Sequence, residues 1–441
     1  MLTIGIDYGT TKNAVLLYDS ENPGNTLVFS EAHHSGCRSS VPGAMEQDFE
    51  KVYRSIIKLI QMIPPEKRQK LSAIGLTGQM HSTLLFSLTG SRISPVITWQ
   101  DKRASLSGTL SGYCRKTGLP LADGFGAVTL AELNRTGVLS RYDAAVNPVS
   151  EIARRLTGCR TLPVMDPTFA ASWGIWQLDK ANWDLQAARK LGIPEKFLPS
   201  TVPAGSIIGK TRDFPGLPDG IPVTAPLGDN QASVYACSEH PEDEIYLTVG
   251  TGSQLSVVLD PDTGIDPGSI ELRPFPGGRL LAVNAPLCGG KAWAFLGKTV
   301  NNFLESLGFA PIPEAELLPR LDALAMSCKT DSTLKIRPSF LGSRREPELR
   351  GEISGITLDN FTLPELAQSM ATGIIRELKD NFPARWLQGR KTAVCSGNGI
   401  RKCQAIQRAI GQEFGLPIKT TTLQEEAATG AAILACEAVQ S

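Results

Sequence analysis

Two segments that lie far apart in the sequence share one pattern of apolar and small residues. In the first, alternating apolar residues run up to Gly9, and a second apolar run covers residues 14–18. In the second, a similar run ends at Gly250, and another covers residues 255–259. Apolar residues at alternate positions on both sides of a small turn are typical of two strands joined by a hairpin. The sequence therefore predicts the same strand-turn-strand unit twice.

Small polar residues form the turn of each predicted hairpin: Gly9, Thr10, Thr11 and Lys12 in the first, and Gly250, Thr251 and Gly252 in the second. Successive backbone N–H groups in glycine-rich turns form concavities that bind anions, so two such turns facing each other would clamp a polyphosphate. A single Gly-Thr turn is most often a plain hairpin turn. The pair is more specific, because the second copy begins a second half of similar size. Neither turn is a Walker loop, since the residues after Lys12 are strand-like rather than helical.

The remaining pattern alternates between strand and helix periods in both halves. Helices with one apolar face are predicted over 47–63, where Pro64 and Pro65 follow, and over 364–382; buried strands are predicted over 73–78 and 392–395. A further helix is predicted from about Arg401 to Phe414, with Gly415 as its C-terminal cap. This alternation predicts an α/β fold with two domains, residues 1–240 and 241–441, joined near residues 238–245.

Composition limits the function classes. The 441 residues include 44 basic and 44 acidic side chains, which argues against a nucleic-acid-binding face. No apolar run reaches the length of a transmembrane helix, and no leader precedes the first predicted strand. The nine cysteines include no Cys-x-x-Cys pair, which favours reduced thiols. We therefore expect a cytoplasmic protein without nucleic-acid or membrane partners.

Polar side chains follow two predicted strands of the first half. Gln79, Met80 and His81 come after one strand, and Trp99, Asp101 and Arg103 come after another. A sugar site needs several converging hydrogen-bonding groups and an apolar wall, which carboxylate, amide and indole groups can supply. A lone histidine after a strand is more often structural, and a lone tryptophan is more often core. The two clusters together favour a polyol site.

Two aspartates are candidates for phosphoryl chemistry. Asp229 follows a Pro/Gly-rich stretch in Gly228-Asp229-Asn230-Gln231, where it could act as a general base or cap a following helix. Asp7 ends the first strand beside the first turn, where it could help to hold a metal or only fix the turn. The residues alone leave both alternatives open.

These motifs together resemble the FGGY family of carbohydrate kinases, within the actin, Hsp70 and hexokinase-like ATPase superfamily. The resemblance covers essentially the whole chain and is carried by seven segments in the family's order: 5–11, 79–81, 99–103, 228–231, 249–253, 397–399 and 426–432. It implies two ribonuclease-H-like domains around a central cleft, with ATP on one side and the sugar on the other. The Gln-Met-His and Trp-Gln-Asp forms resemble the ketose-kinase branch.

The resemblance also implies roles for individual residues. Asp229 would be the general base, and Asp7 would hold Mg²⁺ together with Asp229. The two Gly-Thr turns would contact the ATP phosphates, and Gly397, Asn398 and Gly399 the adenosine. The implied sugar ligands are Gln79, Met80, His81, Trp99, Asp101, Arg103, Asn230 and Gln231. The segment Asp166–Ser172 is similar to one that lines the sugar side in related kinases, although its pattern also fits plain core.

The expected activity is transfer of the γ-phosphate of ATP to a terminal hydroxyl of a ketose, with sedoheptulose as the first expected acceptor. Xylulose or another ketose or polyol is the alternative within the class. A catalytically inert regulatory protein that binds nucleotide and sugar is the alternative from another class. The expected partners are the sugar and ATP, and the chain is expected to be a monomer or a homodimer.

Overall fold

The computed structural model describes residues 1–87, 92–159, 161, 163–261, 268–328, 332–342 and 348–440. The chain forms two compact units. The first contains Met1–Cys237, Arg273–Arg279 and Leu423–Ser441, and the second contains Ser238–Leu272 and Leu280–Thr422. The sequence pattern predicts the break near residue 240, but it gives no signal that the last segment returns to the first unit.

The sheet of the first unit combines an antiparallel meander with parallel strands. Its order is β12-β13-β6-β1-β2-β3, and β14 also pairs with β6. Strand β1 runs antiparallel to β2 and parallel to β6, while β2 and β3 are antiparallel. The strand bounds are β1 Leu2–Tyr8, β2 Lys12–Asp19, β3 Leu27–Ala32, β6 Leu71–Gly78, β12 Ile207–Lys210, β13 Pro222–Thr224 and β14 Leu227–Gly228.

Helices and short strands complete the first unit. The helices are α1 Phe49–Met62, α2 Pro65–Arg68, α3 Arg103–Leu106, α4 Leu110–Thr117, α5 Gly126–Arg135, α6 Pro148–Leu156, α7 Pro167–Ser172, α8 Leu185–Leu191, α9 Asp229–Cys237 and α16 Glu426–Ala438. The short strands are β4 Gly36–Cys37, β5 Glu46–Gln47, β7 Leu84–Phe86, β8 Val96–Ile97, β9 Ala144–Val146, β10 Trp176–Gln177 and β11 Asn182–Trp183. Helix α1 matches the predicted helix, because Asp48 caps its start and Ile63 is extended before the two prolines.

The second unit repeats this strand arrangement. Its sheet has the order β17-β18-β16-β15-β21-β22, in which β15 is antiparallel to β16 and parallel to β21. The strands are β15 Glu244–Val249, β16 Ser253–Leu259, β17 Glu271–Phe275, β18 Arg279–Asn284, β19 Lys335–Arg337, β20 Glu352–Ser354, β21 Thr392–Ser396 and β22 Ile418–Thr420. The helices are α10 Gly290–Ser306, α11 Glu314–Ser327, α12 Leu363–Asp380, α13 Ala384–Leu387, α14 Asn398–Arg401 and α15 Gln404–Phe414.

One predicted helix of the second half begins later than expected. The helix expected from about Arg401 to Phe414 is α15, which begins at Gln404, because the extended backbone of Cys403 separates it from the short helix α14 that ends at Arg401. The carboxylate of Asp322 accepts the N–H groups of Gln404 and Ala405, which caps the start of α15 from another helix. The predicted end of the helix is confirmed, since Gly415 is left-handed and donates to the carbonyl of Gly411.

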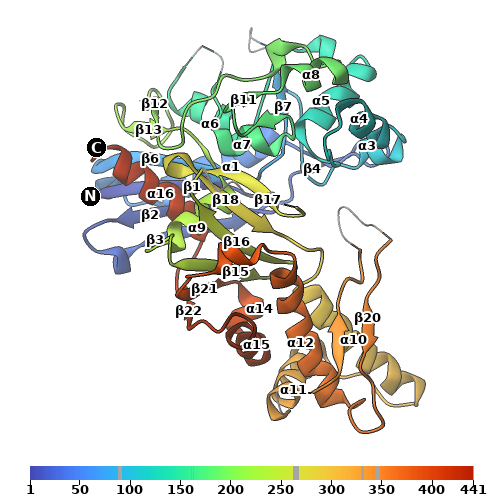
Figure 1. Cartoon of the computed structure of the whole chain (residues 1–441). Coiled ribbons are helices and arrows are strands. Elements are labelled where there is room, and N and C mark those ends of the chain that lie inside the picture. The colour runs from blue at the N-terminus through green and yellow to red at the C-terminus, as the bar shows by residue number, and fades with distance from the viewer. Residues whose placement is uncertain are drawn as a thin grey trace. The chain divides into compact units, whose positions relative to one another are not determined.

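The C-terminal helix α16 packs directly on the sheet of the first unit, where Figure 1 draws it in red beside β1, β2 and β6. A Cβ on Gly5 would collide with the carbonyl oxygen of Ala428, and one on Gly75 with that of Ala431. Small residues on both sides therefore allow helix and strands to approach closely. This packing places β1, and with it Asp7, on a rigid support.

The described residues contain no helix that is both long and apolar enough to span a lipid bilayer. All nine cysteines are free thiols.

Candidate active site

The first Gly-Thr turn joins β1 to β2 with Asp7 one residue before the end of β1. The strands stay paired up to Tyr8 and Asn13, so the turn is tight. A Cβ on Gly9 would collide with the carbonyl oxygen of Lys12, so only glycine fits there. A cavity of about 410 Å³, lined partly by Thr10 and Thr11, opens beside the turn.

The Thr10 side chain ties this turn to the predicted sugar-side residues. Its hydroxyl donates to Oε1 of Gln79 at 3.2 Å and accepts the indole N–H of Trp99 at 2.9 Å. The amide group of Gln79 in turn donates to Oε1 of Gln47 at 2.8 Å. Thr10, Gln79 and Trp99 therefore lie together, as a connected site requires. The hydroxyl of Thr10 is engaged within this network, which leaves its backbone N–H as the group suited to an anion.

Lys12 forms an ion pair with Glu425, the residue before α16, at 2.5 Å. Glu425 has a left-handed backbone with φ of 53°, which is uncommon for a residue other than glycine. The Lys12 side chain is about half exposed, and that of Glu425 is mostly buried. The positive charge that is expected to meet the phosphates is thus partly neutralised by the carboxylate of Glu425.

Asp7 and Asp229 form the acidic centre of the first unit. Burial, followed by the negative charges of Asp229 and Glu425, raises the pKa of Asp7 to about 7, against the opposing charge of Lys12. The buried Oδ1 atom of Asp7 has no hydrogen-bond partner in the described part of the chain. A buried carboxylate oxygen without a partner, close to a second carboxylate, suits a divalent cation.

Asp229 is partly exposed and begins helix α9 directly after β14. Its Oδ1 atom accepts the N–H of the next residue, Asn230, at 2.8 Å, rather than an N–H two or three residues on as in a helix cap. Burial raises the pKa of Asp229 to about 6, although the Asn230 N–H and the charge of Arg273 act in the opposite direction. A carboxylate with this pKa is ionised at neutral pH yet basic enough to take up a proton.

Arg273 is a site residue that the sequence did not reveal. It follows the second Gly-Thr turn in the sequence but belongs to the first unit, where its guanidinium donates to Oδ1 of Asn230 at 2.9 Å. The neighbouring carbonyl of Pro274 accepts a hydrogen bond from Gln231 at 3.2 Å. Segment 273–279 thereby holds the two residues after Asp229. The sequence signal for Arg273 is weak, because a single arginine in a strand has no distinctive pattern.

His81 occupies a constrained position after β6. Its backbone is left-handed with φ of 67°, and its ring stacks on Phe125 with centroids 4.8 Å apart. Nδ1 lies 2.6 Å from the carbonyl oxygen of Ser172, so Nδ1 carries the proton of this hydrogen bond. Met80 and Gln79 are buried, whereas Trp99 is 46% exposed. Trp99 and His81 therefore have surface available for a ligand.

Asp101 and Arg103 are arranged differently from the expectation of a sugar-binding pair. The guanidinium of Arg103 donates to both oxygens of Asp101 at 2.8 Å and to Glu46 at 2.8 Å. Asp101 also accepts the N–H of Met45 at 3.0 Å. Both side chains are buried. Because its oxygens are already engaged, Asp101 is placed to fix the loop that presents Trp99.

The second unit presents its Gly-Thr turn to a large cavity. Gly250, Thr251, Asn398 and Gly399 all line a cavity of about 870 Å³. The remaining lining comes mainly from α10, α11 and α15, and includes Lys291, Trp293, Ala294, Asp322, Lys402, Cys403 and Ile406. The second turn and residues Asn398 and Gly399 therefore border the same cavity.

Glycines allow close backbone packing at this second turn. Gly397 has φ of +89°, and a Cβ on Gly399 would lie 2.7 Å from the carbonyl oxygen of Val249. A Cβ on Gly289 would collide with Gly252. The sequence reasoning passed over Gly289 and Gly290, although two adjacent glycines at the start of a helix were a usable signal.

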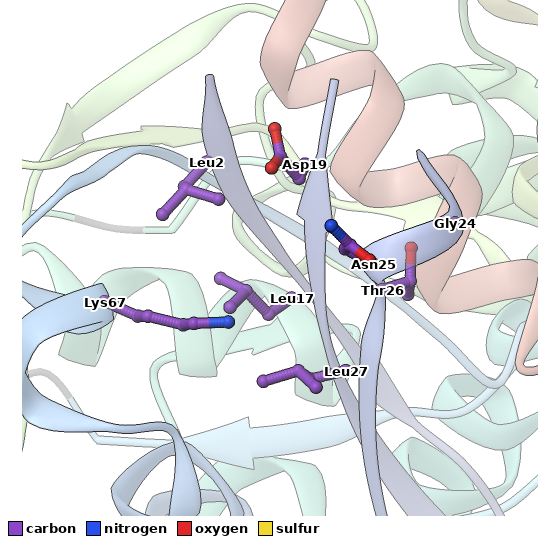
Figure 2. Close-up of a pocket in the computed structure, with 8 residues that line it drawn as sticks. All are labelled: Leu2, Leu17, Asp19, Gly24, Asn25, Thr26, Leu27 and Lys67. Atoms are coloured by element: carbon purple, nitrogen blue, oxygen red, sulfur yellow. The ribbon is translucent and has the colours of Figure 1, made fainter. Parts of the chain in front are cut away.

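A further cavity of about 400 Å³ lies elsewhere in the first unit. Figure 2 shows Lys67 extending into a space bounded by Leu2, Leu17 and Leu27. Leu2 and Leu17 stand at the ends of β1 and β2 opposite to Asp7, so this cavity is separate from the candidate active site.

Comparison with known proteins identifies the family. Residues 2–236 match the N-terminal domain of the FGGY family of carbohydrate kinases. The chain is 28% identical to sedoheptulokinase from Homo sapiens, over 98% of this chain and 97% of that protein. It is 25% identical to a glycerol kinase from Limosilactobacillus reuteri (strain DSM 20016), over 99% and 89% of the two proteins.

Solved structures share the fold. The xylulose kinase from Rhodospirillum rubrum superposes with a TM-score of 0.82 at 21% identity, covering 99% of this chain and 89% of that one. This likeness confirms the expected α/β fold with two ribonuclease-H-like domains. Because the matched domain spans more than half of the sequence, the chain belongs to the FGGY family of carbohydrate kinases.

Proposed function

We propose that this kinase transfers the γ-phosphate of ATP to the terminal hydroxyl of sedoheptulose, giving sedoheptulose 7-phosphate and ADP. The observation that carries the proposal is Asp229, a partly exposed carboxylate with a pKa of about 6 that adjoins Asp7 and the polar loops of the first unit. The choice of sugar is supported by sedoheptulokinases from Homo sapiens and Mus musculus, each 28% identical over nearly the whole chain.

Asp229 would act as the general base. As the sugar oxygen attacks the γ-phosphorus, its proton passes to the carboxylate, and the bond from phosphorus to the oxygen shared with ADP breaks. Such transfers need positioning and charge neutralisation more than covalent help. Arg273 would hold Asn230 in place beside the base and keep Asp229 ionised through its charge.

Asp7 fits a role in holding Mg²⁺, because its buried Oδ1 lacks a partner among the described residues. The described chain contains no cluster of three or more acidic, histidine or cysteine side chains with metal-binding geometry. Mg²⁺ in phosphoryl-transfer sites is commonly held by one or two carboxylates together with phosphate oxygens and water. When bound, the ion neutralises charge on the phosphates. Asp7 and Asp229 would hold it.

The sugar would lie against Trp99 and His81, with Gln79, Met80, Asn230 and Gln231 around them. Trp99 offers an exposed indole face for the carbon chain, and the partly exposed ring of His81 would lie beside the sugar. In this proposal Asp101 and Arg103 act on the sugar through the loop that they hold together.

The nucleotide would use backbone groups of the second Gly-Thr turn for its phosphates. Its adenosine would occupy the cavity of about 870 Å³ lined by Thr251, Asn398 and Gly399, which is within the size range of small-molecule sites. The exposed amine of Lys291 and the side chain of Lys402 line the same cavity and suit an anionic ligand.

The test is ADP release from Mg-ATP with a panel of ketoses and polyols of three to seven carbons. We expect the highest kcat/KM with sedoheptulose. A large preference for xylulose or glycerol would change the assigned acceptor but not the reaction class. Protection of the protein from heat by ATP, without ADP formation from any sugar in the panel, would instead favour an inert binding protein.

A further inference from the structure

Helix α7 begins with a fully buried cap. The Oδ1 atom of Asp166 accepts the N–H of Phe169 and its Oδ2 atom accepts the N–H of Thr168, each at 3.1 Å. Oδ1 also accepts the hydroxyl proton of Thr168 at 2.7 Å. Asp166 and Thr168 are essentially without solvent exposure. The Thr168 hydroxyl is therefore held in one orientation, with its proton turned towards Asp166.

The Thr168 hydroxyl oxygen contacts the backbone that leads into the candidate base. It accepts the N–H of Gly228 at 2.8 Å, and Gly228 immediately precedes Asp229. A Cβ on Gly228 would also press against Gln231 and Met80, so this backbone is closely packed. Asp166, Thr168 and Gly228 thus form a buried chain of hydrogen bonds that ends one residue before the base.

The other end of α7 contacts the His81 loop. The Ser172 hydroxyl oxygen accepts the N–H of His81 at 2.9 Å, and the Ser172 carbonyl accepts Nδ1–H of the same residue at 2.6 Å. The left-handed backbone of His81 is unfavourable for a residue other than glycine, so outside contacts must maintain it. Ser172 supplies two of those contacts.

Thr168 and Ser172 are four residues apart, so they lie on the same face of α7, about 6 Å apart along its axis. One face of a single short helix therefore touches both the base loop and the His81 loop. We propose that α7 is a positioning element that sets the spacing between Asp229 and His81, with Thr168 acting on the first and Ser172 on the second. This inference rests on the proposed sugar kinase function.

The first test compares Thr168→Val with Thr168→Ser. Valine keeps the shape but removes the hydroxyl, whereas serine keeps the hydroxyl. We expect Thr168→Val to lower kcat at least about tenfold, because small displacements of reacting groups are costly. The KM for ATP should stay within about twofold of wild type, since the Thr168 hydroxyl bonds to Asp166 and Gly228 and to no residue assigned to the nucleotide. Thr168→Ser should recover kcat to within about threefold of wild type.

Thr211→Val is the matched control. The buried Thr211 hydroxyl also accepts a backbone N–H, from Ile221 at 2.9 Å, and donates to a backbone carbonyl, that of Pro218, at 2.7 Å. Thr211 lies between β12 and β13, outside the candidate site. We expect this variant to lose a similar amount of thermal stability but to keep the wild-type kcat per folded molecule.

Ser172→Ala tests the second contact, and it tests the inference by itself if Thr168→Val does not fold. It should raise the KM for the sugar about fivefold while leaving the KM for ATP unchanged, because only the His81 N–H loses its acceptor. The inference is overturned if Thr168→Val behaves like Thr211→Val, if Thr168→Ser is as slow as Thr168→Val, or if Ser172→Ala leaves sugar kinetics unchanged. A wild-type protein that phosphorylates no sugar overturns the proposed function itself, and this inference with it.

Discussion

Hairpins β1–β2 and β15–β16 occupy the same place in two sheets with the same strand arrangement, yet their surroundings differ. The strand parallel to β1 is β6, which continues into Gln79, and the side chain of Gln79 bonds to Thr10 in the turn. The strand parallel to β15 is β21, which continues into Gly397, Asn398 and Gly399 and packs closely on Val249. A polar side chain contacts the first turn, whereas closely packed glycines lie beside the second.

The two strand ends differ in charge as well. Asp7 lies two residues before Gly9, and the matching position before Gly250 is Thr248, whose hydroxyl bonds to that of Ser396 at 2.8 Å. One turn is thus surrounded by carboxylates and the other adjoins a cavity of about 870 Å³. One copy of the repeated hairpin therefore lies near carboxylates, and the other borders a large cavity.

The largest expected effect comes from the base. Asp229→Asn should lower kcat with the sugar by about 10³-fold, because the amide cannot accept the proton. Binding of Mg-ATP, measured by calorimetry, should stay within a few-fold of wild type. The control is Asp219→Asn, which changes an exposed aspartate that accepts a backbone N–H from Asp213. Wild-type turnover in Asp229→Asn would remove this residue from the mechanism.

Filling the cavity of the second unit should weaken nucleotide binding without affecting the other steps. Ala294→Trp places a large ring in the cavity from helix α10. We expect the KM for ATP to rise at least about tenfold, which corresponds to about 1.4 kcal/mol. The kcat at saturating ATP should change little, since the base and sugar loops belong to the first unit. An unchanged KM for ATP would show that the adenosine binds elsewhere.

The pH profile of kcat/KM should have an acidic limb. Because the pKa of Asp229 is about 6, protonation below that pH removes the base, and the rate should fall about tenfold per pH unit. Asp7 interacts with Asp229, so the apparent pKa belongs to the pair. The profile should be measured at saturating Mg²⁺, with the coupling enzymes in excess at every pH. A flat profile from pH 5 to 8 would contradict this assignment.

A smaller effect is expected at the edge of the first turn. Lys12→Met should raise the KM for ATP only a few-fold, because the charge is already partly neutralised by Glu425. The Lys12 side chain is about half exposed, so losing the ion pair should change the melting temperature by no more than about 2 °C. Titration calorimetry with ATP and a melting curve would measure both quantities. A hundredfold loss of affinity would mean that Lys12 leaves Glu425 to bind phosphate.

Asp7 should make the metal-free protein less stable at higher pH. Its pKa is about 7 in the folded state and about 3.9 when unfolded, so folding takes up a proton between these values. The destabilisation is absent below about pH 4 and fully present above about pH 7. Asp7→Asn should therefore raise the melting temperature at pH 8 by roughly 5 °C in the presence of EDTA, and leave it unchanged near pH 4.

Thr248→Val is the matched variant for this measurement. It removes a neutral hydroxyl at the corresponding strand end of the second unit, so any change in its melting temperature should not depend on pH. If Asp7→Asn and Thr248→Val showed the same dependence on pH, the electrostatic difference between the two hairpins would be refuted.

The sequence by itself determined the repeated hairpins, the alternation of strands and helices, and the C-terminal ends of α1 and α15. These features depend on local periodicity, on prolines and on glycines that cap helices, all of which are written in neighbouring residues. The family also followed from motifs in order along the chain.

Only the tertiary structure decided which polar groups are already engaged. Arg103 and the N–H of Met45 occupy the oxygens of Asp101, and Glu425 reaches Lys12 from the far end of the chain. The break at Cys403 arises because Asp322 of another helix caps α15. Such hydrogen bonds and buried contacts form between residues that are distant in sequence, so a local sequence pattern cannot predict them.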